Sequence, residues 1–165
     1  MGAWKSAALS ILQVLSANPA DNMQMVVTLV LGFLGAYWAL HKVAVTMKFP
    51  MAESGRSAAI LVIGTALLLL AAIAGRLYIA PHVPGSLRLW IPLITAAVIF
   101  LVAVVPLAWF MHRSNYVRAM NACLLAIAAG ALVILLTKAA SDAIRQGSKG
   151  FDKSRERTRS IDEVL

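Results

Sequence analysis

The chain has 165 residues, of which 61% are hydrophobic and 13% are charged, and its formal net charge is +8. A soluble domain is about half apolar and about a quarter charged, so this composition excludes an ordinary soluble fold. The apolar residues gather in four blocks of more than about 18 residues, the length that crosses a hydrocarbon core of about 30 Å. The sequence therefore predicts an all-α integral membrane protein with four transmembrane helices.

Residues 1–22 are predicted to form a short amphipathic helix that lies on the membrane surface. Asn18-Pro19 ends this helix, because the residue before a proline is disfavoured in the α region. The positions expected toward lipid are Trp4, Leu9, Ile11, Leu12 and Leu15, and those expected toward water are Lys5, Ser6, Ser10 and Gln13.

The transmembrane domain is expected over residues 23–140, as two helical hairpins. Its four spans are expected at about 23–47, 57–80, 87–111 and 116–140. The first two connections, 48–56 and 81–86, each contain glycine and proline, as turns between helices should. Pro92 and Pro106 lie near the two ends of the third span, where each removes a backbone donor and is expected to kink the helix. The carbonyls that these prolines free need partners in neighbouring helices or water.

Small residues recur at helical spacing in the first and fourth spans. Such stripes let two helix backbones approach closely in a membrane, where packing drives helix association. We expect these two spans to pack against each other through Gly32, Gly35 and Ala39 on one helix and Ala122, Ala126 and Gly130 on the other.

The motif Trp-x-x-His-Lys/Arg occurs twice, at residues 38–42 and 109–113, near the ends of the first and third spans. Tryptophan, histidine and basic residues at a helix end are typical of the belt between hydrocarbon and headgroups. The alternative is a haem or quinone site formed by His41 and His112, which are expected at similar depth on one side of the membrane. The echo also suggests that the two hairpins are copies of one unit.

Residues 141–165 form a polar tail of mixed charge. Its basic residues are candidates for contact with a partner protein or with lipid headgroups: Lys149, Lys153, Arg155, Arg157 and Arg159.

The basic residues also predict an orientation. Ten of the fifteen lie on the side of the two termini and the 81–86 linker, and five lie on the other side: Lys42, Lys48, Arg56, Arg113 and Arg118. The positive-inside rule then favours both termini in the cytoplasm, with the protein in a bacterial inner membrane.

The sequence contains little that could carry chemistry. None of the apolar blocks holds an Asp or Glu, whereas coupled transporters commonly place a carboxylate near the midplane of the bilayer. We find no catalytic triad, no metal-binding motif and no phosphate loop, and Cys123 is the only cysteine, so we expect no enzymatic activity, no metal and no bound cofactor. The basic residues are not gathered on one soluble face, so nucleic acid is not expected as a partner.

The expected function is therefore a structural or accessory subunit of a larger membrane assembly, or the repeated unit of a homo-oligomer. Its partners would be the lipid bilayer, other membrane subunits or copies of itself. One alternative is an oligomeric channel or carrier with a polar seam, and the second is an electron-transfer subunit that uses His41 and His112.

Overall fold

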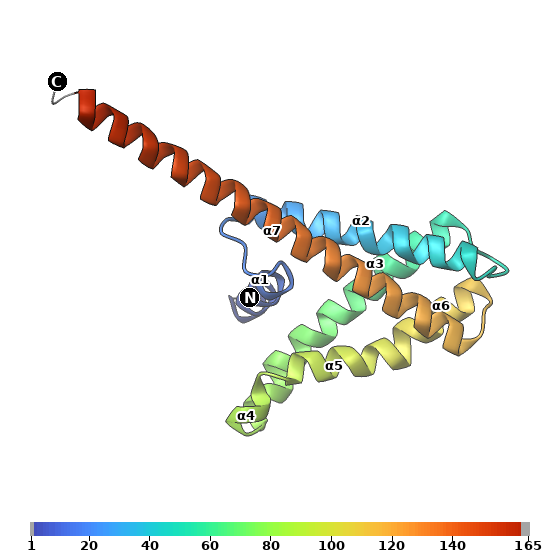
Figure 1. Ribbon diagram of the computed structural model, residues 1–165. Helices are drawn as coiled ribbons and strands as arrows, with labels where there is room; N and C mark the ends of the chain where they lie inside the picture. Colours follow the sequence, from blue (N-terminus) through green and yellow to red (C-terminus); the bar gives the residue numbers. More distant parts are fainter. Residues whose placement is uncertain (1, 163–165) are drawn as a thin grey trace.

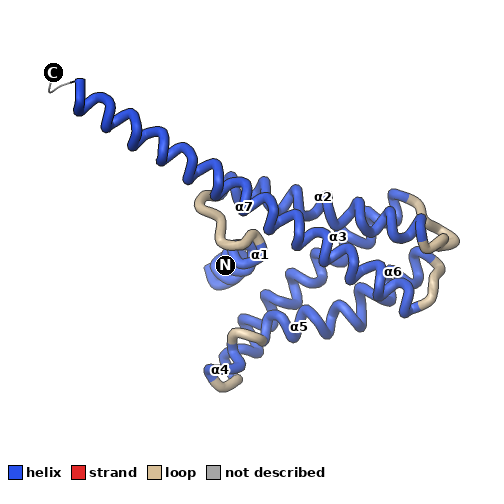
Figure 2. Tube along the Cα trace, in the orientation of Figure 1, coloured by secondary structure: helices blue, strands red, loops and turns tan. Residues whose placement is uncertain are grey.

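The computed structural model describes the backbone of residues 2–162 and the side chains of residues 2–146. Residues 2–162 contain helices and no strands (Figures 1 and 2). The elements are α1 (Gly2–Leu15), α2 (Asn22–Thr46), α3 (Ser54–Ala74), η1 (Gly75–Ile79), η2 (Ala80–His82), α4 (Gly85–Arg88), α5 (Ile91–Ile99), η3 (Phe100–Val104), α6 (Val105–His112) and α7 (Tyr116–Asp162).

Four helical segments are long and apolar enough to cross a membrane: Asn22–Thr46, Ser54–His82, Ile91–His112 and Tyr116–Gln146. The prediction of an all-α, multi-pass membrane protein is thus confirmed. Asp21 caps the first of these segments, since its side chain accepts a hydrogen bond of 2.6 Å from the Gln24 backbone N–H.

The four spans form two pairs that converge at one end and separate at the other (Figure 1). α2 runs along α7, and α3 runs along α5; α1 lies at the open end, between the two pairs. The buried core lies at the converged end, where the α2–α3 and α6–α7 connections meet. Its members are Leu40, Ala44, Phe49, Ile60, Phe100, Val104, Val105, Ala108, Ala119, Ala122, Cys123 and Ala126.

The α2–α7 pair is held at close range by glycines. A Cβ atom added at Gly32 would lie 2.5 Å from Ile134 Cγ1, and one added at Gly130 would lie 3.0 Å from the Gly32 carbonyl oxygen. At Gly35, an added Cβ would lie 2.7 Å from Val133 Cγ2. Larger residues at these positions would force the two backbones apart.

Two π-helical turns interrupt the middle spans, and each stands at the same offset from a proline. η1 is followed by Ala80-Pro81, and η3 by Val105-Pro106. The last N–H before each proline bonds five residues back, from Ala80 to Gly75 and from Val105 to Phe100. A proline ring crowds the carbonyl four residues before it, and the wider π turn relieves that contact.

The π turn at Pro106 deprives the Leu101 carbonyl of its usual α-helical donor, because Val105 N–H bonds to Phe100 instead. The Tyr116 hydroxyl, from the start of α7, donates a hydrogen bond of 2.9 Å to this carbonyl. At the other π turn, Arg88 Nε donates to the Ala80 carbonyl at 3.0 Å. Side chains from elsewhere in the chain thus donate to one carbonyl near each π turn, in a solvent that offers no donors of its own.

The structure differs from the sequence prediction at three element ends. Pro92 lies in the first turn of α5, where its missing N–H costs no helical hydrogen bond, so it starts a helix and does not kink one. The third membrane-crossing segment accordingly begins at Ile91 and not near residue 87. α7 continues without a break to Asp162, so the change in polarity near residue 140 falls inside a helix.

Candidate functional site

His112, the last residue of α6, is fully buried. Its Nδ1 lies 2.9 Å from the Met51 carbonyl oxygen, and its ring packs on Phe49 with centroids 5.5 Å apart. A carbonyl only accepts, so Nδ1–H is the donor in this contact. Nε2 has no hydrogen-bond partner among the described residues. This histidine joins the end of α6 to the 47–53 connection inside the core.

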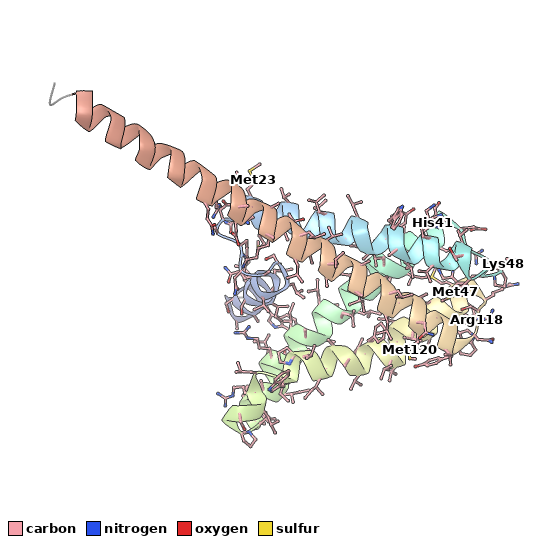
Figure 3. All side chains as sticks on the ribbon, viewed as in Figure 1. Met23, His41, Met47, Lys48, Arg118 and Met120 are labelled. Carbon is pink, nitrogen blue, oxygen red and sulfur yellow. The ribbon has the colours of Figure 1, made fainter. Side chains whose placement is uncertain are left out.

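His41 has different surroundings, although its motif is the same. α2 continues for five residues beyond His41, and Figure 3 shows His41 well before the turn at Lys48. Its ring stacks on Tyr37 with centroids 6.3 Å apart and planes at 7°. Its Nδ1 is buried and lacks a hydrogen-bond partner among the described residues. Beside it, Trp38 is exposed, and Lys42 Nζ lies 5.9 Å from the Trp38 ring centroid.

His41 and His112 contact different residues, Tyr37 in the first case and Phe49 and Met51 in the second. No hydrogen bond or ring contact joins His41 to His112 within the described side chains. Residues 2–146 also contain no group of three His, Cys, Asp or Glu side chains that could hold a metal ion.

A small pocket of about 50 Å³ lies beside the core between the converging spans. It is lined mainly by apolar side chains, among them Leu40, Phe100 and Cys123, and no histidine lines it. This volume has room for a water molecule but not for a haem or a quinone.

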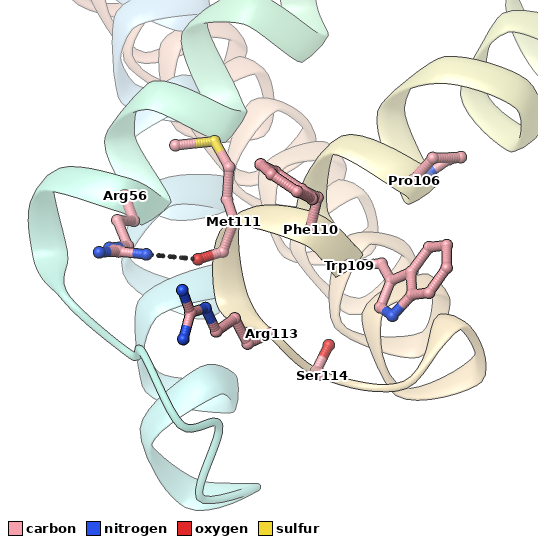
Figure 4. A pocket seen from close by; sticks show the side chains of 7 residues that line it. All are labelled: Arg56, Pro106, Trp109, Phe110, Met111, Arg113 and Ser114. Carbon is pink, nitrogen blue, oxygen red and sulfur yellow. Dashed lines mark hydrogen bonds between the residues drawn. The ribbon is translucent and has the colours of Figure 1, made fainter.

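An open groove of about 720 Å³ lies on the outer side of the end of α6 (Figure 4). Its residues are Arg56, Pro106, Trp109, Phe110, Met111, Arg113 and Ser114. Arg56 Nη1 donates a hydrogen bond of 2.9 Å to the Met111 carbonyl, and Arg56 Nε forms an ion pair with Glu53 at 3.0 Å. The Arg56 side chain is therefore held at the groove from a neighbouring helix.

Arg113 reaches the groove because of the way α6 ends. Arg113 has a left-handed backbone with φ of 48°, and the Ser114 N–H bonds to the Trp109 carbonyl five residues earlier. This left-handed end reverses the chain without a glycine. The exposed side chains of Trp109 and Phe110 lie in the last turn of α6, and the exposed Arg113 follows the end of that helix.

At the open end of the bundle, polar contacts tie α1 and the 16–21 connection to both pairs of spans. Arg76 donates to the Ser10 hydroxyl, and Lys138 donates to the Ala17 carbonyl. Arg145 forms an ion pair of 2.7 Å with Asp21. Ala7 is the buried residue of α1, whereas Trp4, Leu9 and Leu15 are exposed. The Trp4 ring also packs edge-on against Tyr78 of η1, with centroids 6.2 Å apart. α1 thus meets the bundle through a small, a polar and an aromatic residue, and Ser10 faces an arginine of the bundle.

The predicted packing residues all lie at helix contacts or in the interior. Gly32, Gly35 and Gly130 form the close α2–α7 approach, and Ala39, Ala122 and Ala126 are buried. The five tail residues are Lys149, Lys153, Arg155, Arg157 and Arg159; they lie on the α7 backbone, but their side chains are outside the described ones.

Sequence reasoning missed the groove because Arg56 and Arg113 are 57 positions apart and looked like two separate loop charges. One signal was present. Glu53 and Arg56 are three residues apart at a helix start, a spacing at which side chains meet and an arginine can be fixed in place. Arg113 lies at the same groove only because of the way the helices pack, and no spacing in the sequence indicates this.

Comparison with known proteins gives no relative: no protein-family model, curated protein or solved structure matches the chain.

Proposed function

We propose that the protein is an accessory subunit of a larger membrane assembly. The four spans anchor it in the bilayer, and the part of α7 beyond the apolar region is the arm that binds a partner. This proposal rests on the length and continuity of α7.

α7 has 47 residues, from Tyr116 to Asp162, which at 1.5 Å per residue corresponds to about 70 Å. A hydrocarbon core is only about 30 Å thick. The apolar part of α7 ends near residue 140, where Ser141 and Asp142 begin its polar part. Residues 147–162 of the helix therefore extend past the apolar part. Figure 1 shows this segment projecting alone from the bundle.

The composition of the projecting segment supports a docking role. Residues 147–162 contain five basic and three acidic residues, with Phe151 and Ile161 among them. A lone polar helix of this length is marginally stable in water, and packing against a partner would stabilise it. A partner with an acidic groove would complement its charge.

The spans also offer surface to other subunits. Only 28–33% of each apolar window is buried within the bundle, which leaves most side chains facing lipid or other helices. Glu53 is the only acidic residue between Asp21 and Asp142, and it lies outside the four spans as a helix cap. Within the four spans the only acidic residue is Asp142, close to the end of the fourth, so no carboxylate lies in the middle of a span. Cation-coupled carriers commonly depend on such a carboxylate, which favours an accessory role over transport.

Purification from native membranes in mild detergent, followed by native mass spectrometry, tests the proposal. The full chain should carry a partner at fixed stoichiometry. A chain that stops after Gln146 should reach the membrane but lose that partner. Replacement of Lys149, Lys153, Arg155, Arg157 and Arg159 by Gln should weaken the association and make it less dependent on salt. A monomer without any partner, or a partner that is retained by the shortened chain, would contradict the proposal; a mass of several identical chains would show a homo-oligomer instead.

A further inference from the structure

We propose that the groove at the end of α6 binds one anionic phospholipid. The phosphate would lie between Arg56 and Arg113, and an acyl chain would lie along Pro106, Trp109 and Phe110. This inference is independent of the accessory role, because the groove is at the opposite end of the bundle from the projecting part of α7 (Figure 1).

The cationic end of the groove is built from two different helical hairpins. Arg56 and Arg113 both line the groove, and Figure 4 shows the hydrogen bond from Arg56 to the Met111 carbonyl. Arg56 is fixed there by bonds to that carbonyl and to Glu53. Arg113 has no side-chain hydrogen bond or ion pair with any described residue. Two guanidinium groups that line one groove repel each other. A phosphate group bound between them would accept charge-assisted hydrogen bonds from both and so offset that repulsion.

The other end of the groove is apolar and open toward lipid. Phe110 is 81% exposed and Trp109 is 49% exposed, although both lie in a helix that crosses the membrane. Pro106 continues this surface one turn deeper, and Arg113 and Ser114 lie beyond the end of the helix. The groove therefore changes from apolar to cationic in the direction in which a phospholipid changes from acyl chain to phosphate.

The charge of this membrane face identifies the class of lipid. Five basic residues lie on this side, and Glu53 is the one acidic residue in the whole stretch between Asp21 and Asp142. Glu53 offsets part of the charge of Arg56, and Arg113 keeps its full charge. A headgroup with net negative charge, such as phosphatidylglycerol, is complementary to this arrangement, whereas phosphatidylcholine would bring its own cation beside the arginines.

Quenching of tryptophan fluorescence by brominated lipids measures lipid occupancy at one site. The chain has four tryptophans: Trp4, Trp38, Trp90 and Trp109. The test protein keeps only Trp109, with Phe at the other three positions, and is reconstituted in bilayers that contain brominated phosphatidylglycerol or brominated phosphatidylcholine at equal mole fraction. A second protein that keeps only Trp38 is the matched control, because Trp38 also lies beside a basic residue but outside the groove.

At Trp109, the relative binding constant should favour phosphatidylglycerol by about fivefold or more, as expected for one basic group that contacts an anionic lipid. At Trp38 the ratio should lie near 1. Arg113→Gln should bring the Trp109 ratio close to 1, and Arg113→Lys should keep most of the preference. Arg118→Gln changes an exposed arginine on the same side that does not line the groove, and it should leave the ratio unchanged.

Equal quenching of Trp109 by the two lipids would overturn the proposal. So would the same preference at Trp38, or the same loss with Arg118→Gln, since either result would indicate general enrichment of anionic lipid. Millimolar inorganic phosphate should not reduce the preference at Trp109; if it does, the arginines bind free phosphate and not a lipid.

Discussion

At the scale of single residues, one sequence motif has produced two environments. His41 and His112 both follow a tryptophan by three residues and precede a basic residue. His112 terminates its helix and is enclosed by the 47–53 connection, while His41 lies on a helix that continues past it. The difference depends on where each helix ends, which the motif does not encode.

This difference predicts unequal costs of mutation. His112→Ala removes a buried ring and leaves the Met51 carbonyl without its donor, so we expect a loss of about 2–4 kcal/mol in unfolding free energy. His41→Ala removes a half-buried ring without a hydrogen-bond partner among the described residues, so we expect a loss below about 1 kcal/mol. Reversible unfolding in mixed micelles with increasing dodecyl sulfate measures both values. Equal losses of unfolding free energy in the two variants would mean that the hydrogen bond from His112 to the Met51 carbonyl does not stabilise the fold.

The candidate site shows the limit of the sequence at this scale. Trp109 and Arg113 were recognisable as an interfacial pair because they belong to one short motif, in which they lie four positions apart. Arg56 was not recognisable as their neighbour, because it reaches the Met111 carbonyl across 55 positions of the chain. Contacts of that range follow from how helices pack, and a single sequence does not record them.

At the scale of helices, the α2–α7 pair is the best-defined contact of the bundle. Its glycines place one backbone against the other, as in the 3.0 Å approach between an added Cβ at Gly130 and the Gly32 carbonyl. Backbone atoms cannot rotate away as a side chain can, so a larger residue at Gly130 could not be accommodated without a shift of the helices.

A pair of matched substitutions tests this contact. Gly130→Val should force α2 away from α7 and destabilise the bundle by about 1–3 kcal/mol. Gly55→Val, at the exposed start of α3 where an added Cβ meets nothing within 4 Å, should change stability by less than about 0.5 kcal/mol. The same unfolding assay measures both. If the variant at residue 130 is as stable as the one at residue 55, the two helices are not in close contact.

The number of membrane-spanning helices and their approximate positions followed from the sequence, because a run of about 20 apolar residues is typical of a transmembrane helix. Helix ends did not follow. Pro92 looked like a kink, yet a proline in a first turn is favourable, and only the three-dimensional start of α5 distinguishes the two cases. The extension of α7 to Asp162 was missed. A change to polar composition indicates where the chain leaves the membrane, but it does not indicate where the helix ends.

At the scale of the whole molecule, the spans open like a V with α1 at its mouth. Composition cannot predict this shape, because lipid-facing and core-facing residues are both apolar in a membrane. The distribution of charge does bear on how the V is oriented. The open end carries the ion pair of Arg145 and the basic residues that follow it, so we predict that this end faces the cytoplasm.

Thiol labelling in intact bacterial cells tests this orientation. The background variant Cys123→Ala removes the native thiol, and Ser54→Cys or Ser86→Cys then introduces one at an exposed position on either side. A membrane-impermeant maleimide should label the cysteine at residue 54 in intact cells. It should label the one at residue 86 only after the inner membrane is permeabilised. The opposite pattern would place both termini outside.

The π turns change the direction in which the side chains after them point around the helix axis. A π turn accommodates one extra residue, so every side chain after it is rotated by about 100° relative to an uninterrupted α-helix. η3 therefore determines which stripe of α6 meets the core and which meets lipid, with His112 on the first and Phe110 on the second. Deleting one residue from 100–104 would turn both stripes together, whereas exchanging one apolar residue for another there would not. In this segment the number of residues matters more than their identity.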